Sequence, residues 1–110
     1  MAIELTAPQR RAIAKALAPF ADAVEAVAVY GSRATGMARL GSDVDLVFYG
    51  DASPRRIRAA LDESDLSIFA DVVRYDEIQN PQLRAEIDRD ALPLFTRADL
   101  TAFARRDASR

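Results

Sequence analysis

The chain contains no cysteine and no histidine among its 110 residues. These absences exclude disulfide bonds, thiol chemistry, zinc sites built from thiolate or imidazole, and a serine–histidine–aspartate triad. Any metal ion must therefore be held by oxygen. Carboxylate ligands together with substrate phosphates suit Mg²⁺, with Mn²⁺ as a substitute.

Long apolar runs and a strong excess of charge are also missing. No run approaches the roughly 18 residues of a membrane-spanning helix, and no signal peptide is recognisable, so we expect a cytoplasmic protein without a membrane partner. The 15 basic and 17 acidic residues give a formal net charge of −2, which provides no general attraction to nucleic acid. With 50% hydrophobic residues, we expect one small domain over residues 1–110.

Glycine is scarce, and all four glycines fall between Gly31 and Gly50. The first three are spaced five residues apart, which matches neither the dinucleotide-binding fingerprint nor the P-loop. A hydrophobic run ends at Gly31-Ser32, where exposed backbone N–H groups could hold phosphate oxygens. Ser32 could instead cap the turn that follows the strand.

A second hydrophobic run carries two carboxylates at Asp43 and Asp45. In a strand, residues two apart lie on one face, with their Cα atoms roughly 6.6 Å apart. That spacing would let the pair hold two cations separated by about 3.5–4 Å. The alternative is two solvated acids on an exposed sheet face.

Gly31-Ser32, ten intervening residues and Asp43-Val44-Asp45 together resemble the signature of the DNA polymerase β-like nucleotidyltransferases. The pattern is most similar to the minimal nucleotidyltransferases, small prokaryotic proteins encoded beside HEPN-domain toxins. The resemblance implies two Mg²⁺ ions, ATP as substrate and a third acidic ligand on the next strand, which Asp71 would supply. Asp71 could instead pair with an arginine such as Arg74 or lie at an exposed edge, with Asp76 as the other candidate for the third acid.

The predicted nucleotide-binding residues are Gly31, Ser32, Arg33 and Ser42, and the predicted catalytic and metal-binding residues are Asp43, Asp45 and Asp71. Arg33 and Arg39 could neutralise triphosphate charge, although a loop arginine is more often only solvated. Tyr30 and Tyr49 end strands near the site, where packing is a better explanation than stacking on a base.

The resemblance implies an antitoxin that transfers AMP from ATP to a hydroxyl group, expected to be a tyrosine, of a HEPN-domain ribonuclease toxin, in a complex with that toxin. Two other functions remain open: neutralisation of the partner by binding alone, and transfer to a small molecule or an RNA end. The toxins of such pairs use a histidine-containing motif. Because this chain has no histidine, it cannot be the ribonuclease.

The pattern of caps and apolar residues predicts an α/β (α+β) fold, a small mixed sheet with helices packed on it. Helices are expected to begin at Thr6, Ser53, Asn80 and Thr96, the first ending near Ala18. Strands are expected over 27–30, 43–49, 66–73 and 92–95. The inward-facing pairs are predicted to be Ile13 and Leu17, Ile57 and Leu61, and Leu83 and Ile87, and the last helix is predicted to carry Leu100 and Phe103. The tail over about 99–110 is a candidate for docking a partner.

Overall fold

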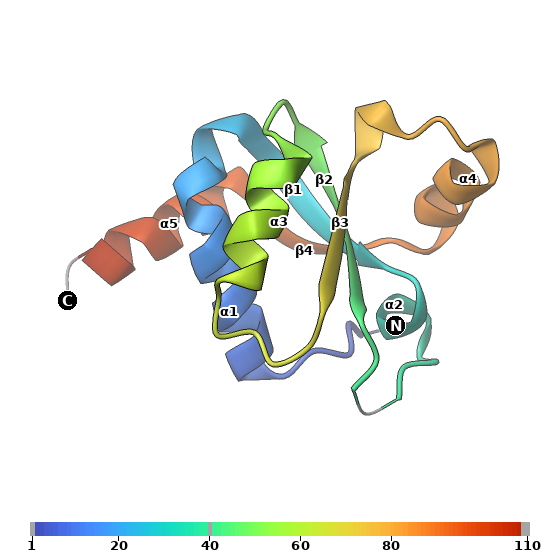
Figure 1. The fold of residues 1–110 in the computed structure, drawn as a ribbon, viewed down its shortest axis with the longest axis horizontal. Coiled ribbons are helices and arrows are strands. Elements are labelled where there is room, and N and C mark those ends of the chain that lie inside the picture. Colours follow the sequence, from blue (N-terminus) through green and yellow to red (C-terminus); the bar gives the residue numbers. More distant parts are fainter. Residues whose placement is uncertain (1, 40, 109–110) are drawn as a thin grey trace.

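The computed structural model describes residues 2–39 and 41–108, and helices pack on both faces of its four-stranded mixed sheet (Figure 1). The strands are β1 (Val24–Tyr30), β2 (Val44–Gly50), β3 (Ala70–Arg74) and β4 (Leu92–Thr96). The α-helices are α1 (Ala7–Leu17), α2 (Ser32–Thr35), α3 (Pro54–Asp62), α4 (Pro81–Asp90) and α5 (Arg97–Ala108). Two short 3₁₀ helices are η1 (Ala18–Ala23) and η2 (Tyr75–Glu77). This architecture confirms the predicted fold class.

Each of the predicted helices begins at the cap residue that the sequence offers. Thr6 and Gln9 form a reciprocal capping box at the start of α1. Side-chain oxygens of Ser53 and Asn80 accept backbone N–H bonds at the starts of α3 and α4. At α5, Thr96 accepts from the N–H of Asp99, whose carboxylate accepts from the N–H of Thr96. Local side-chain chemistry therefore fixes where these helices start.

The strands follow the order β3-β2-β1-β4, which places β3 and β4 at the two edges. β1 runs antiparallel to β2 and to β4, whereas β2 and β3 run parallel. Pro93, which lacks a backbone N–H, lies in the edge strand β4, where an unpaired position is tolerated. The crossover between the parallel strands contains α3, as a parallel pair requires.

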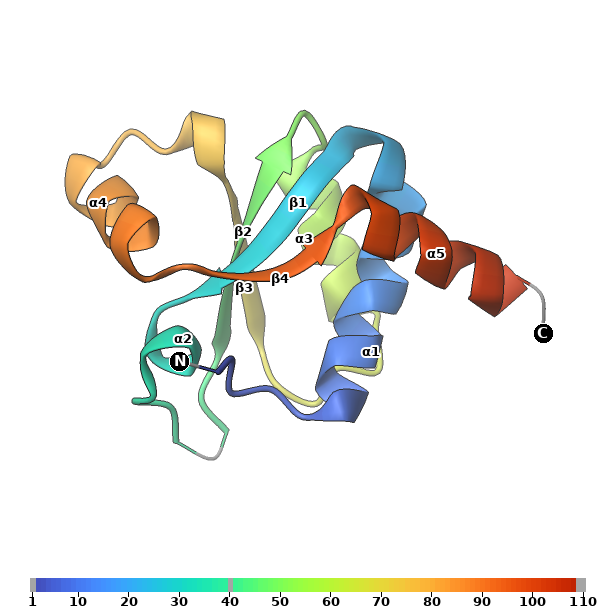
Figure 2. The same ribbon diagram turned by 180° about the vertical axis from the view of Figure 1, so that it is seen from behind.

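The two faces of the sheet carry different layers, seen from opposite sides in Figures 1 and 2. On one face, Leu46 and Phe48 are fully buried in the main core with residues of α1, α3 and α5. On the other face, Val47 packs with Ala28 and with Ile87 of α4 in a second, smaller cluster. Because alternate residues of a strand face opposite sides, the position of Val47 identifies the α4 face as the one that Asp45 shares.

Several strand boundaries differ from the prediction. The chain after α1 continues as η1, and β1 begins at Val24, earlier than the predicted residue 27. The third strand begins at Ala70 and not at Leu66, because its only neighbour β2 begins at Val44, the register partner of Ala70. The one-turn helix α2 was not predicted.

The predicted tail forms most of α5, whose first turn buries Leu100 completely in the main core. Phe103, on the same helix, is partly buried and belongs to neither core cluster. Residues 109–110 of that predicted tail lie outside the described part. Among the helices of residues 2–39 and 41–108, none has the length and apolar character needed to cross a membrane.

Candidate active site

Three polar side chains lie in line across three neighbouring strands. Tyr30 at the end of β1 is the register partner of Asp45 in β2, and Asp45 is the partner of Asp71 in β3. Val47 and Val73, two residues further along β2 and β3, both pack in the cluster beneath α4. By the period-2 rule, Asp45 and Asp71 project from this same face. The structure therefore brings together the two aspartates that the sequence separates by 26 positions.

Negative charge is concentrated around Asp45. Burial raises the pKa of the Asp45 carboxyl, and the charges of Asp71, Asp43 and Glu86 raise it further. Asp43 precedes β2 and is exposed, and its place two residues before Asp45 fits the predicted shared face. The structure thus gathers three carboxylates whose mutual repulsion a cation would relieve.

The backbone at Gly31 lies directly against the Asp45 carboxylate. A Cβ built on Gly31 would fall 2.5 Å from Asp45 Oδ2, so only glycine allows this approach. Gly31 also has a φ of +71° and precedes α2, which has no side-chain cap. The N–H groups of Ala34 and Thr35 donate to the carbonyl oxygen of Gly31, whereas those of Ser32 and Arg33, at the start of the helical turn, have no acceptor within it. This geometry suits the phosphate contact predicted for Gly31 and Ser32, which stays a prediction.

Arg33 and Ser42 hold the loop that connects β1 to β2. The Arg33 side chain is buried, at 7% exposure, and its Nη2 and Nε donate to the carbonyl oxygen of Ser42 at 2.7 and 3.1 Å. Its Nη1 donates to the carbonyl oxygen of Glu4 at 2.7 Å. Ser42 Oγ accepts from the Arg39 N–H at 2.8 Å. The structure therefore gives Arg33 and Ser42 contacts inside the protein and does not support the predicted contact of Arg33 with the triphosphate.

These bonds predict that Arg33→Lys lowers the free energy of unfolding by about 2–3 kcal/mol, because an ammonium cannot reproduce a guanidinium fork that bonds two carbonyl groups. Arg39→Lys, in the same loop but with an exposed arginine, should change it by less than about 0.5 kcal/mol. Urea denaturation of both variants measures the difference. Equal stabilities would contradict a structural role for the Arg33 guanidinium.

Asp71 pairs with an arginine, as one of the alternatives expected, but the partner is Arg58 and not Arg74. Arg58 of α3 reaches the edge strand, where its Nη2 lies 3.3 Å from Asp71 Oδ1 and donates to the carbonyl oxygen of Val72 at 2.9 Å. Both side chains are nearly half exposed, at 43% and 45%, so the pair contributes at most about 1 kcal/mol. Such a weak pair leaves Asp71 able to exchange the arginine for a divalent cation.

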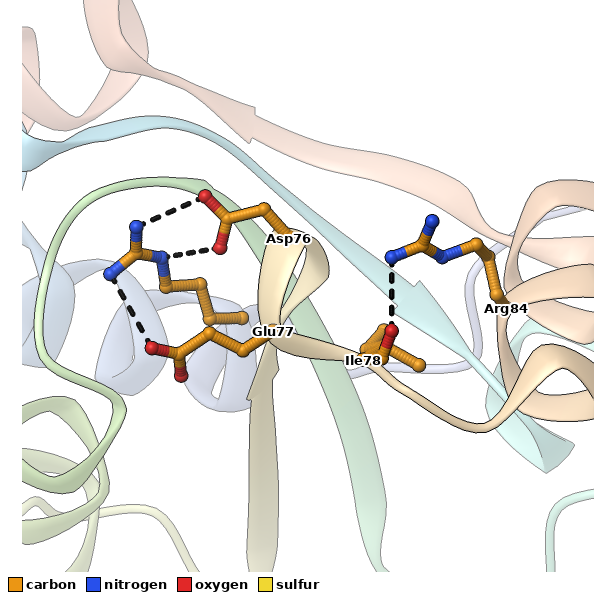
Figure 3. A network of polar contacts seen from close by, with 5 residues as sticks. Asp76, Glu77, Ile78 and Arg84 are labelled. Carbon is orange, nitrogen blue, oxygen red and sulfur yellow. Dashed lines mark hydrogen bonds and ion pairs between the residues drawn. The ribbon is translucent and has the colours of Figure 1, made fainter.

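Arg74 does not pair with Asp71. It forms ion pairs with Asp76, Nε to Oδ1 at 2.6 Å, and with Glu77, Nη1 to Oε2 at 3.6 Å (Figure 3). Arg74 lies three residues beyond Asp71 along β3, roughly 10 Å away at about 3.3 Å per residue. Asp76 is thus held at the far end of β3, which disfavours it as the third acid.

The donor set fits Mg²⁺ only in part. No group of three acidic side chains within residues 2–39 and 41–108 converges closely enough to form a complete metal cage. Mg²⁺, however, is usually held by one or two carboxylates together with water and substrate phosphates. Asp45 and Asp71, with the exposed Asp43 nearby, can supply that share. The residues present therefore suit a metal that arrives with a nucleotide.

Two residues of this region carried no recognisable signal in the sequence. Glu86 is one position before the buried Ile87 in α4, and its charge helps to raise the pKa of Asp45. Burial, followed by the charges of Asp45, Asp71 and Glu86, raises the pKa of Tyr30 to about 12. Arg58 of α3 is the second residue, as the neighbour of Asp71. Both assignments depend on how helices dock on the sheet, which no local pattern reveals.

Tyr49 is engaged in packing on the α4 face. Its ring lies 4.9 Å from that of Tyr75, centroid to centroid, and the guanidinium of Arg84 lies 5.2 Å from the Tyr75 centroid. Arg84 also donates to the carbonyl oxygen of Ile78 at 2.9 Å (Figure 3). Tyr75 in turn donates to Asp88 at 2.7 Å. These contacts help to fix η2 and α4 beside the aspartates.

Comparisons with known proteins agree with this geometry. The sequence profile of the family described as polymerase beta, nucleotidyltransferase, matches residues 12–100. A solved structure named as a minimal nucleotidyltransferase is 32% identical, with a TM-score of 0.58, over 84% of this chain and 96% of that one.

Two further structures are similar in fold. A toxin–antitoxin with AMP-PNP has a TM-score of 0.65 at 19% identity, over 91% of this chain and 84% of that one. The toxin–antitoxin MntA-HepT has a TM-score of 0.61 at 16% identity, over 94% and 85% of the two chains. None of the curated proteins matches this chain.

Proposed function

The chain belongs to the polymerase β nucleotidyltransferase family, as one of its minimal members, and from this premise we propose that it is an antitoxin that transfers AMP from ATP to a tyrosine hydroxyl of a HEPN-domain toxin. The observation that carries the proposal is the alignment of Asp45 with Asp71 beside the backbone of Gly31. Carboxylates next to a free helical N-terminus are the arrangement that phosphoryl chemistry requires.

Each part of the site has a role in the proposed reaction. The N–H groups of Ser32 and Arg33 would hold the terminal phosphates of ATP, and Asp43, Asp45 and Asp71 would hold two Mg²⁺ ions. When bound, Mg²⁺ neutralises charge on the triphosphate and lowers the pKa of the attacking hydroxyl. The hydroxyl oxygen attacks the α phosphorus, pyrophosphate leaves with the electron pair of the broken P–O bond, and Asp71 takes the hydroxyl proton.

This chemistry needs no covalent intermediate on the chain. Positioning of the reactants and neutralisation of their charge supply most of the acceleration. The chain has no histidine, and in the proposed reaction the carboxylate of Asp71 accepts the proton of the hydroxyl. The similar folds named as toxin–antitoxin structures, one with AMP-PNP, support the choice of partner and nucleotide.

The decisive experiment is to purify the chain with its HEPN-domain partner and to measure the intact mass of that partner after incubation with ATP and Mg²⁺. We expect mass increases that correspond to added adenylyl groups, absent when ATP or Mg²⁺ is omitted. Tryptic mapping should place the groups on a tyrosine.

Two results would contradict the proposal. An inhibited but unmodified partner would indicate neutralisation by binding alone. An unmodified partner with release of pyrophosphate only when a small molecule or RNA is added would indicate another acceptor.

A further inference from the structure

A groove lies between α1 and α5, on the side of the sheet opposite to α4. Its volume is about 660 Å³, within the roughly 300–1,000 Å³ of pockets that bury a ligand. Figures 1 and 2 show α5 extending past α1 toward the carboxyl end of the chain. The groove shares no residue with the aspartate site.

Basic side chains outnumber acidic ones in the lining of this groove, in which Asp65 and Asp107 also lie. Arg11 and Lys15 lie one helical turn apart on α1, and Arg106 lies on α5. All three are exposed, and none forms an ion pair with another described residue. Such charges remain available to a partner in a molecule whose formal net charge is −2.

Aromatic surface lies between the charges. Phe95 of β4 and Phe103 of α5 both line the groove and are partly buried. Phe103 has no place in either core cluster, so its ring does not stabilise the fold as the other large apolar side chains of α5 and β4 do. Apolar side chains flanked by exposed cations form the usual anatomy of a protein contact, an apolar centre with a polar rim.

We propose that this groove docks an acidic, amphipathic segment of a partner protein, with one or two apolar side chains against Phe103 and Phe95 and carboxylates toward Arg11, Lys15 and Arg106. Charge complementarity selects this occupant. Attraction by exposed cations would orient the segment, and burial of its apolar side chains would provide most of the affinity.

Two other occupants fit less well. A second copy bound through the same groove would place Arg11 and Lys15 of one molecule opposite those of the other, because a two-fold interface is self-complementary. A nucleic acid carries a phosphate at every nucleotide, so some phosphates would face Asp65 and Asp107, whereas a peptide can place its carboxylates opposite the cations alone.

The test uses a fluorescent peptide of about 16 residues, long enough to form a helix, with glutamates on one face and leucines on the other. Fluorescence anisotropy with the full chain should give saturable binding, which is lost when glutamine replaces the glutamates or serine replaces the leucines. The charge-reversed double variant Arg11→Glu, Lys15→Glu should bind at least about tenfold more weakly. Phe103→Ser should also weaken binding.

The matched control is the double variant Arg55→Glu, Arg56→Glu, which makes the same change in net charge on exposed residues of α3, outside the groove. It should bind the peptide like the parent chain, and circular dichroism should show that every variant is folded. Absence of saturable binding, or equal weakening in the control, would overturn the proposal. Binding of single-stranded RNA in place of the peptide, or a dimer that Arg11→Glu, Lys15→Glu disrupts, would overturn it in favour of those occupants.

Discussion

We expect Asp45→Asn to reduce nucleotidyl transfer by at least about 10³-fold, because it removes charge stabilisation of several kcal/mol and each 1.36 kcal/mol is tenfold in rate. Asparagine keeps the size of the side chain, so the effect of charge is isolated. Asp45 is the central residue of the site, since its register partners are Tyr30 on one side and Asp71 on the other. The rate of AMP incorporation into the HEPN-domain partner measures the loss.

Two matched variants locate the third acid. Asp71→Asn should also reduce the rate of transfer strongly. Asp76→Asn removes an aspartate that is bound to Arg74, away from the chemistry, and its rate of transfer should stay within about twofold of that of the parent chain. The reverse outcome would transfer the ligand role to Asp76. Co-purification with the partner should persist in all three variants, and loss of binding in Asp45→Asn would mean that its effect was not on chemistry.

Asp45→Asn should also stabilise the nucleotide-free protein. Because burial and the charges of Asp71 and Asp43 raise the pKa of Asp45, the folded state holds its proton more tightly than the unfolded state. Ionisation of this carboxyl therefore opposes folding. The stability of the parent chain falls as the pH rises from 3.8, the ordinary pKa of an aspartate, through the raised pKa of Asp45 in the folded state.

This linkage fixes the pH dependence. Above this pH window, the free energy of unfolding of Asp45→Asn should exceed that of the parent chain by about 0.5–2 kcal/mol, the size of commonly observed surface-charge improvements. Below the window, the two proteins should be equally stable. Thermal unfolding of both proteins without metal or nucleotide, in acid and at neutral pH, measures the difference. A lower Tm for the variant at neutral pH would contradict the repulsion inferred around Asp45.

The sequence was most informative where a property depends on neighbours along the chain. The period-2 rule places Asp45 on one face of its strand, and the predicted third strand carries Asp71 to the same sheet. Helix starts were also predictable, because Thr6 and Asn80 bond to N–H groups within three residues. Such local rules were sufficient for the mixed sheet, whereas the place of Asp71 beside Asp45 was implied by the resemblance to the nucleotidyltransferases.

Contacts distant in sequence could not be predicted. Arg33 donates to the carbonyl oxygen of Glu4, 29 positions away, and this contact connects two parts of the protein. The motif alone had suggested a contact with phosphate. Arg58 reaches Asp71 only because α3 docks beside the edge strand. Phe103 follows Leu100 by three residues on α5 and lines the groove that α1 and α5 form together. The docking of whole elements decides these cases, and a single sequence contains no direct record of it.

Gly31→Ala should lower nucleotidyl transfer by about 10²-fold or more, the loss expected when a catalytic group is displaced by about 1 Å. Its new Cβ would lie 2.5 Å from Asp45 Oδ2, so the carboxylate must rotate away from its position beside Asp71. The rotation itself is cheap for the fold, because Oδ2 is the end of a flexible side chain. The damage therefore falls on the chemistry.

Gly41→Ala is the control that separates this contact from backbone strain. Gly41 has a φ of +83°, close to the +71° of Gly31, but a Cβ there would meet nothing within 4 Å. Both variants should lose about 1–3 kcal/mol of stability for a side chain at positive φ, measured by urea denaturation. Only Gly31→Ala should lose transfer activity when both are assayed well below their Tm. Equal activity in the two variants would show that the close approach of Gly31 to Asp45 has no part in positioning the carboxylate.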